Sequence, residues 1–549
     1  MPAEEIPLSD YFTWVDWLVV FGYLGLTTLV GHFMKGKQAS IKDFFLGGRT
    51  LPWPAVSGSI IATEISGVTF VGVPGLVFAA GGDFTYLQWA IGSIAARILV
   101  GIFFVRAYYE KEIYSPYDFM GNRLGVGVKR LATGIFWIGS ILGQSVRVLV
   151  AALALRVILP ESVTFEHCII IIGVFAIGWT LMGGMRTVIW TDVMQFFLFA
   201  VGGSVALFWI VGHLGGGWGE FWSVASGGRE FGEALMEPGG PGDENKFRLF
   251  NFATDPAVEF TLWVALIAVP FQNLSAFGVD QLNAQRMFCC KNAGDARKAI
   301  IFSSFGQLLA LLMLLVGAGL FVFYQAQPPS AEAAARFAEN NDYVFPVWIT
   351  TTLPTGLRGL ILAGVFAAAI SSLDSILAAL SQTTLSLFRH HGTDEDAEQE
   401  SEAEAKRGVV LSRLLVMVWG VFLTGFAIAL YNLQGNINIV ALAFGMVAYS
   451  TGPMLGLFLA ALFRLRGSFG GIVAGAVISF FLVLLVRTDI YVILQSFGIF
   501  QPSDLPSFWP VGPGATGGFA PAISFAWMYP VTTFVTLGCG ALGAKLKKP

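Results

Sequence analysis

The sequence predicts an all-α polytopic membrane protein with about thirteen transmembrane helices. Of the 549 residues, 55% are hydrophobic and only 12% are charged, about half the charged share of a soluble domain. The mean hydropathy is +0.70, and surface-to-volume scaling prevents a soluble fold from covering so apolar a chain with polar side chains. The apolar residues also fall in runs of about 20, the length that crosses a hydrocarbon core of ~30 Å.

The apolar runs set the order of the helices. We expect transmembrane helices over residues 13–34, 55–80, 84–107, 129–158, 164–184, 188–213, 256–278, 298–325, 357–388, 408–431, 437–464, 469–487 and 521–543. Because this number is odd, the termini should lie on opposite sides of the membrane. Most Lys and Arg residues fall in the loops of one side, such as those holding Lys35, Lys129 and Arg297. Cytoplasmic loops carry the excess of Lys and Arg, which predicts the N-terminus outside and the C-terminus inside.

The remaining stretches are loops, and the composition excludes other function classes. Residues 214–255 and 326–346 should form external loops, the second with a short helix, and the acidic run 390–406 a solvated inner linker. Four cysteines are too few for a disulfide framework, so we expect free thiols. The net charge of −4 predicts no nucleic-acid partner. Five histidines without metal spacing or a nucleophile–base pair predict no enzyme activity.

Two of the expected spans carry residues that interrupt a helix. In the second span, segment 61–75 (IATEISGVTFVGVPG) contains Glu64 and Pro74 where plain Leu and Val would suffice. In the seventh span, segment 265–278 (ALIAVPFQNLSAFG) contains Pro270 at a similar depth. Gly and Pro free backbone groups, which then need partners other than lipid. A proline kink explains one such span, but a matched pair favours an inverted repeat with a substrate between the two breaks, near the midplane.

The inverted repeat divides the chain into five parts. We expect the first transmembrane helix and an inner loop in residues 1–54, the first repeat of five helices in 55–213, an external loop in 214–255, the second repeat of five helices in 256–464, and two C-terminal transmembrane helices in 465–549.

A stripe of small and polar residues runs along the ninth span. Ala368, Ser371, Ser372 and Ser375 follow a spacing of i, i+3, i+4 and i+7 and share one helix face, with Asp374 at its margin. Hydroxyl and carboxylate oxygens suit a hard cation such as sodium. Helix packing with serines bonded to their own backbone also explains the serines. It does not explain Asp374, whose charge costs ~3 kcal/mol or more at the bilayer centre unless it is neutralised.

Further charged residues fall inside or near spans. Asp192 is either interfacial or shares a cation site with Asp374, and an ion would neutralise both acids if neither has a basic partner. Arg147 lies within the fourth span, and its guanidinium suits a carboxylate, either that of Glu64 or an acidic group of the substrate. Arg97 is nearer the inner face, where it either extends to the interface or pairs with another residue.

Several of these segments resemble the sodium/solute symporter family, which includes sodium-coupled carriers of sugars, proline, sialic acid, iodide and monocarboxylates. The matching segments, in family order, are DFFLGGRTLPW (43–53), IATEISGVTFVGVPG (61–75), MGGMRTVIWTDVMQ (182–195), QRMFCCKNAGDARKA (285–299) and AAAISSLDS (367–375). The resemblance covers at least residues 40–465. It implies a LeuT-type core of ten helices in a 5+5 inverted repeat, with one helix before the core and two after it.

The resemblance also implies where one or two sodium ions bind. The main sodium site of the family corresponds to backbone oxygens of Ala62, Ile65 and Ala368 and to the hydroxyl groups of Ser371 and Ser372. The second sodium site of some members corresponds to Asp192, Ser371, Asp374 and Ser375. Asp374 stands where some relatives have a hydroxyl residue, and a carboxylate there should strengthen cation binding.

The substrate contacts of the sialic acid branch correspond to Ser66, Thr69, Gln88 and Arg147. In the sugar branch, a stacking aromatic residue would fall on Ala276, although the asparagine three residues earlier is present as Asn273. An alanine cannot stack on a sugar ring. Glu64 and Asn273 complete the set of expected substrate residues.

These expectations define a sodium-coupled symporter that imports a small organic solute by alternating access. The favoured solute bears a carboxylate, like sialic acid or another organic acid. A symporter of sugars or other neutral solutes, with Glu64 paired to Arg147, is the alternative, and a membrane sensory protein is a more remote one. We expect a multi-pass protein of the cell membrane that functions as a monomer in the lipid bilayer.

Overall fold

The thirteen apolar runs of the sequence each contain a helix in the computed structural model. It describes residues 7–34, 36, 46–110, 115–181, 185–240, 244–388, 402–433, 439–465, 467–496, 498–499, 501–506, 509–514 and 519–546. In this part of the chain, nine helices are long and apolar enough to cross a membrane, and a pair bent by 53° makes a tenth candidate. Three shorter apolar helices, within 165–180, 264–279 and 357–366, fall in the other expected spans. The total of thirteen crossings stays a prediction.

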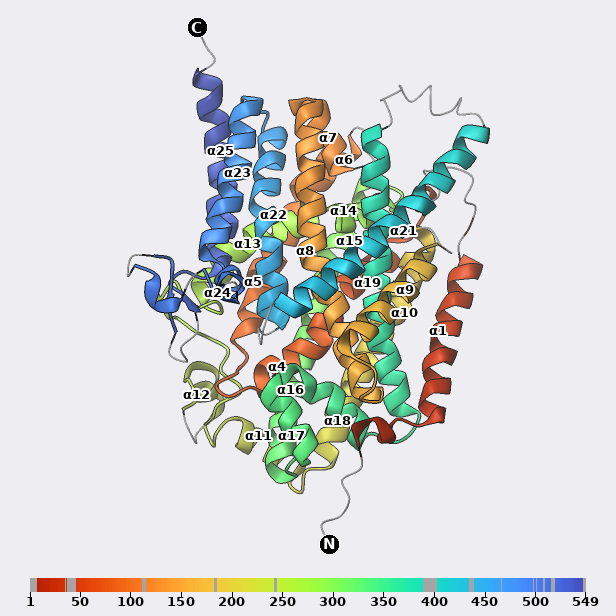
Figure 1. Ribbon diagram of the computed structural model, residues 1–549, viewed down its shortest axis with the longest axis vertical. Coiled ribbons are helices and arrows are strands. Elements are labelled where there is room, and N and C mark those ends of the chain that lie inside the picture. The colour runs from red at the N-terminus through yellow and green to blue at the C-terminus, as the bar shows by residue number, and fades with distance from the viewer. Residues whose placement is uncertain are drawn as a thin grey trace.

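The membrane-crossing part is built from helices of both halves of the chain (Figure 1). The first half contains α1 (Trp14–Met34), α3 (Trp53–Glu64), α4 (Val73–Phe78), α5 (Trp89–Leu99), α6 (Val105–Tyr109), α7 (Pro116–Leu124), α8 (Val126–Ile158), α9 (Phe165–Thr180) and α10 (Met185–Gly212). The second half contains α13 (Val269–Leu274), α14 (Gln281–Phe288), α15 (Ala293–Phe302), α16 (Gly306–Ala326), α19 (Leu357–Phe388), α21 (Glu402–Leu433), α22 (Ile439–Leu462), α23 (Phe469–Val486) and α25 (Met528–Leu546).

Shorter elements connect these helices. They are α11 (Gly217–Ala225), α12 (Phe231–Met236), α17 (Ala331–Glu339), α18 (Val344–Thr352), α24 (Thr488–Ser496) and a two-stranded hairpin of β1 (Val511–Pro513) and β2 (Phe519–Pro521). The expected helix in loop 326–346 is confirmed as α17. We call the end of the molecule that carries α11, α12 and α17 the outer end (Figure 1). The first described residues lie there, where the amide of Leu8 donates to Glu332 of α17, and α25 ends at the opposite end.

The surface of the helical bundle is apolar, as a lipid-facing surface must be. Large side chains such as Phe33, Phe208, Val421 and Phe534 are more than half exposed, on α1, α10, α21 and α25. In water, apolar patches of this extent would drive association. Inside, the buried apolar residues form one connected core.

The second span is broken where the sequence predicts it. α3 ends at Glu64, Ile65 takes the non-helical conformation φ −77°, ψ 73°, and a π-helical turn (Val68–Gly72) leads into α4. α10 packs along α3, and α16 packs along α4, so the two halves of the broken span lie against different neighbours. A break of this kind inside a bundle leaves backbone groups for a ligand.

The seventh span is interrupted at a different residue from the one the sequence indicates. Pro270 and Asn273 lie inside a continuous helical stretch, in which π-helical turns (Val264–Ala268 and Ser275–Val279) flank α13. The wider π turn accommodates Pro270, which has no amide hydrogen to donate. The helix instead ends at Asp280, whose extended backbone (φ −66°, ψ 130°) redirects the chain into α14. The break expected at Pro270–Asn273 is therefore wrong by about two turns.

The two broken spans are held together by the long helices around them. α8 packs against both α22 and α19, and α10 packs against α3, α16 and α19. α23 and α25 pack on each other and on α22, outside the broken spans. The breaks at Ile65 and Asp280 thus lie in the interior, away from the lipid-facing surface.

Candidate functional site

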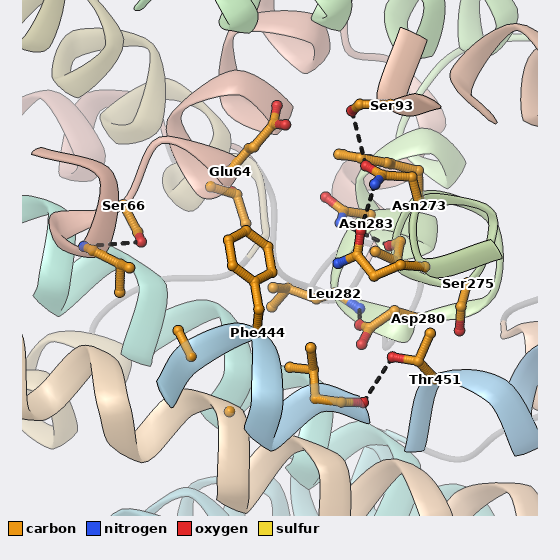
Figure 2. Close-up of a pocket in the computed structure, with 18 of the residues that line it drawn as sticks. Glu64, Ser66, Ser93, Asn273, Ser275, Asp280, Leu282, Asn283, Phe444 and Thr451 are labelled. Carbon is orange, nitrogen blue, oxygen red and sulfur yellow. Dashed lines mark hydrogen bonds between the residues drawn. The ribbon is translucent and has the colours of Figure 1, made fainter. Parts of the chain in front are cut away.

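A cavity of about 210 Å³ lies between the two broken spans. Its wall combines the break of the second span, the seventh span through Asn283, and the facing sides of α8 and α22. In Figure 2, Glu64 and Ser66 lie on one side, and Asn273, Ser275, Asp280 and Asn283 lie on the other, with the ring of Phe444 between them. The position of this cavity agrees with the expected position of a substrate site.

Arg147 lines the cavity from α8 and has no protein partner among the described residues. Its Nη1 atom is buried and makes no hydrogen bond. Asp280 lines the same cavity, and the two charges are close enough to act on each other, but they form no ion pair. The Asp280 carboxylate instead accepts a hydrogen bond from the Leu282 amide at 2.8 Å, which caps α14. A buried guanidinium with free donors is the strongest anchor for a carboxylate that the cavity offers.

Glu64 is paired with Arg97, and not with Arg147. Arg97 of α5 is fully buried, forms an ion pair with Glu64, and donates to the carbonyl of Ser303 at 3.2 Å. The other carboxylate oxygen of Glu64 accepts from the side-chain amide of Gln307 at 2.9 Å. The expected alternative of a Glu64–Arg147 pair is therefore wrong. Of the two alternatives for Arg97, pairing with another residue is the one that the structure bears out.

Three aromatic side chains of the cavity wall, Tyr86, Trp89 and Phe444, pack into a cluster with Phe260. The Trp89 ring lies 4.9 Å from that of Phe444 and 5.4 Å from that of Phe260, centroid to centroid, and Tyr86 packs 5.6 Å from Phe260. We call Tyr86, Trp89, Phe260 and Phe444 the outer aromatic cluster. These residues come from both halves of the chain, so the cluster forms where the two halves pack together.

The expected substrate residues are only partly brought to the cavity. Ser66, Thr69, Glu64, Asn273 and Arg147 line it, whereas Gln88 does not. The side chain of Gln88 is buried beside the outer loop, where it donates to the carbonyl groups of Thr85 and Phe260 and accepts from the Asn251 amide. Gln88 therefore holds the loop in place, and the expectation of a direct substrate contact is not met in this conformation. Asn273 faces the cavity while accepting a hydrogen bond from Ser93 at 2.8 Å (Figure 2).

The break of the second span leaves two carbonyl groups without their helical donors. The amide of Ser66 donates to the Glu64 carbonyl at 2.9 Å, and not to that of Ala62, four residues earlier. The amide of Thr69 donates to the Ser66 carbonyl at 2.9 Å, and not to that of Ile65. Both carbonyl groups were expected to bind sodium. Ser372 is buried on α19, which packs against α3, while the side chains of Ala368 and Ser371 lie outside the described residues.

The expected second sodium site contains an arginine. Asp192 of α10 is buried and forms an ion pair with Arg286 of α14, whose Nη2 lies 3.1 Å from the Asp192 carboxylate and 2.7 Å from the Ser375 hydroxyl. Ser59 of α3 donates to the same carboxylate. Asp192 therefore has the basic partner whose absence would have required an ion.

Asp374 remains a buried carboxylate without a basic partner. It is 4% exposed, lies against the Thr180 hydroxyl of α9, and forms no ion pair among the described residues. The charges of Asp192 and Arg286 both act on it. Of the two acids expected in the second site, only Asp374 still needs a neutralising charge.

Sequence reasoning missed three features of the site. Arg286 lies in the motif segment 285–299, and no local pattern marks it as a buried ion-pair partner. Asp280 comes two residues after Gly278 at the end of an apolar run, where a glycine followed closely by an acid could have indicated the break. The outer aromatic cluster has no sequence signal, because its members are far apart in the chain and aromatic residues are common in all spans.

The chain is similar to known proteins along most of its length. The model of the sodium:solute symporter family matches residues 44–478. The sodium/sialic acid symporter SiaT of Proteus mirabilis is 28% identical over 87% of this chain and 90% of its own. The sodium/glucose cotransporter of Vibrio parahaemolyticus is 27% identical over 85% of this chain and 84% of its own. A solved structure of a Na⁺-coupled sialic acid symporter in a substrate-bound outward-open state covers 98% of this chain and 99% of its own, with 24% identity and a TM-score of 0.75. This last similarity supports the expected LeuT-type fold.

Proposed function

The chain belongs to the sodium:solute symporter family, and from this premise we propose that it imports a small carboxylate-bearing solute across the cell membrane. As a member of this family it is a multi-pass, sodium-coupled transporter of a small solute and not an enzyme. The favoured solutes are sialic acid and other organic acids. The single observation that supports a carboxylate on the solute is the guanidinium of Arg147, which lines the central cavity without an ion-pair partner among the described residues.

The electrostatics of the cavity support an anionic group on the solute. Glu64 and Arg97 neutralise each other, which leaves Arg147 and Asp280 as the unpaired charges of the wall. A carboxylate that meets Arg147 can form two parallel hydrogen bonds to its planar fork. A hydroxyl or amine elsewhere on the same solute could donate to Asp280. Ser66 and Thr69 provide hydroxyl groups on the facing wall.

The main sodium ion is proposed to bind at the break of the second span. Its ligands would be the carbonyl oxygens of Ala62 and Ile65, which lack helical donors, and oxygens of α19 from Ala368, Ser371 and Ser372. A cation there bridges α3 to α19 and fixes the angle of the break. The shape of the Ser66–Thr69 wall follows that angle, so sodium and solute would each favour the conformation that binds the other.

Several further features belong to this proposal. The Lys and Arg distribution supports the assignment of the outer end to the outside of the cell, with the C-terminus inside. An inward sodium gradient and a negative interior then drive import, with ~2.3 kcal/mol per charge for each 100 mV. We also propose that the chain functions as a monomer, since the two halves of one chain supply both walls of the cavity.

Uptake by purified protein in proteoliposomes tests the function. Radiolabelled sialic acid, lactate and glucose are compared, with an inward sodium gradient and with potassium in place of sodium. We expect sodium-dependent uptake of an acid. R147Q should raise its KM about 10- to 100-fold, because a hydrogen bond to a charged group contributes about 1.5–3 kcal/mol.

Arg156, more than two turns after Arg147 on the same helix, is a matched control. Arg156 of α8 donates to the Leu159 carbonyl and does not line the cavity. R156Q should therefore leave the KM unchanged. Equal uptake of the acid by wild type and R147Q would overturn the carboxylate proposal. Sodium-dependent glucose uptake that R147Q does not alter would support the neutral-solute alternative.

A further inference from the structure

The guanidinium of Arg286 occupies the centre of a buried polar cluster at the inner half of the seventh span. Its Nη2 contacts Asp192 and Ser375, and its Nε donates to the Ser59 hydroxyl at 2.9 Å. Its Nη1 donates to the Leu282 carbonyl at 2.7 Å within α14. Arg286 itself is fully buried. Every nitrogen of the guanidinium thus has an oxygen partner.

A sodium ion cannot share this position with the guanidinium. One nitrogen atom lies 3.1 Å from the Asp192 carboxylate and 2.7 Å from the Ser375 hydroxyl. A hard cation bound by the same two oxygens would sit about 2.3–2.6 Å from each, in the space that this nitrogen fills. Sodium binding by Asp192 and Ser375 therefore requires the side chain of Arg286 to leave.

We propose that Arg286 is a covalently tethered cation that takes the place of a second sodium ion, so that this symporter couples transport to one sodium ion at the main site. The inference rests on the sodium coupling of the proposed function and specifies its stoichiometry. It also specifies a latent site: without the guanidinium, Asp192, Asp374 and Ser375 are free to bind a second sodium ion.

The charges of the cluster favour this exchange. Asp192 and Asp374 are both buried, and Arg286 carries the positive charge that faces them among the described residues. Removing that charge leaves two carboxylates close together in a medium of low polarity, where an uncompensated charge is expensive. A monovalent cation from solution restores the charge that the guanidinium supplied.

The tether also has a structural consequence. Arg286 lies on α14, whereas Ser59 lies on α3, Asp192 on α10 and Ser375 on α19. Two of these helices come from the first half of the chain and two from the second. A free sodium ion could leave toward the cell interior, but the guanidinium can leave only if α14 moves. The contact therefore holds the inner halves of both broken spans together.

The sodium dependence of solute uptake, measured in proteoliposomes, tests the proposal. We expect a Hill coefficient near 1 for the wild type. R286Q should raise it toward 2, whereas R286K, which keeps the positive charge, should leave it near 1. The double variant R286Q/D192N should have a Hill coefficient near 1 again, because one of the carboxylates of the latent site is removed. Sodium-induced thermal stabilisation of each purified variant should follow the same order, and this readout does not depend on transport.

A milder variant keeps the proposal testable if R286Q does not fold. Ser375 carries no charge, so S375A leaves the ion pair in place and should fold. If Arg286 fills the site, S375A should also leave the Hill coefficient and the half-saturating sodium concentration unchanged. A wild-type coefficient near 2 that falls to 1 in S375A would overturn the proposal. So would a folded R286Q whose coefficient stays at 1.

The main-site variant S372A separates the two proposals. It should raise the half-saturating sodium concentration severalfold in the wild type and in R286Q alike. A lack of effect of S372A would contradict the proposed main site and leave the role of Arg286 unaffected. If S372A raises the half-saturating sodium concentration but the wild-type Hill coefficient is near 2, the main site is supported. Only the proposal that Arg286 replaces a second sodium ion is then contradicted.

Discussion

Glu64, the last residue of α3, forms an ion pair with Arg97 of α5, and this pair determines the charge of the central cavity. Arg97 and Arg147 lie well inside the third and fourth spans, and one acid, Glu64, lies at the break of the second span. Because Arg97 takes that acid, Arg147 forms no ion pair among the described residues, although the charge of Asp280 acts on it. The proposed binding of an anion by Arg147 thus depends on the pairing of Glu64 with Arg97.

The Glu64–Arg97 pair should contribute strongly to stability. Breaking a buried pair by removing one partner costs about 3–5 kcal/mol, because a charge stays behind unpaired. E64Q and R97Q should each lower the thermal midpoint in detergent by several degrees, and the double variant should lose less than the sum of the two. The exposed Arg106–Glu110 pair is the control: R106Q should cost at most about 1 kcal/mol. Additive losses at Glu64 and Arg97 would contradict the pairing.

Phe444 should limit access to the cavity from the outer end. F444A removes the ring that packs against Trp89, which opens the outer aromatic cluster. A cysteine placed at Ser450, in the cavity wall, should then react severalfold faster with a membrane-impermeant maleimide. F534A, at a lipid-facing ring, serves as the control and should leave the rate unchanged. Equal labelling rates with and without the Phe444 ring would show that the cluster does not limit access.

Gly92 should be intolerant of even a methyl group. A Cβ atom there would lie 2.2 Å from the carbonyl oxygen of Ala265, where α5 crosses the seventh span. The two helices would have to move apart to make room for it. We expect G92A to destabilise the protein by about 1–3 kcal/mol, the usual cost of overpacking. Gly134 of α8 has no atom within 4 Å of the corresponding position. G134A should therefore keep the wild-type thermal midpoint, and a similar midpoint for G92A would contradict the close approach.

Cys289 should be unreactive in the folded protein. It is fully buried at the end of α14, and burial raises the pKa of its thiol to about 12. Because the thiolate is the reactive form, maleimide at neutral pH should label Cys289 only after denaturation. Mass spectrometry of protein labelled before and after unfolding measures this difference. Rapid labelling of Cys289 in folded protein would indicate an accessible inner face of α14.

The sequence by itself was enough to predict the features that depend on composition and local chemistry. Apolar runs of membrane-crossing length predict the helices, because a single segment in lipid can satisfy its backbone hydrogen bonds only as a helix. The break near Glu64 follows from the Gly and Pro residues around it, which act on the adjacent backbone. The polar stripe through Ser372 and Ser375 follows from helical spacing alone. For the same reason the segment 265–278 was misinterpreted: Pro270 interrupts a regular α-helix, but a π turn absorbs the interruption locally.

Only the tertiary structure determines which charged residues form ion pairs with one another. Asp192 and Arg286 are 94 residues apart, and Glu64 and Arg97 are separated by a loop, so no local pattern links either pair. In a medium of low polarity each buried charge requires a partner, and several partners of the right sign are available in the sequence. Helix packing selects among them by distance. It assigns Arg97 to Glu64 and Arg286 to Asp192, and it thereby leaves Arg147, Asp280 and Asp374 without an ion-pair partner among the residues described.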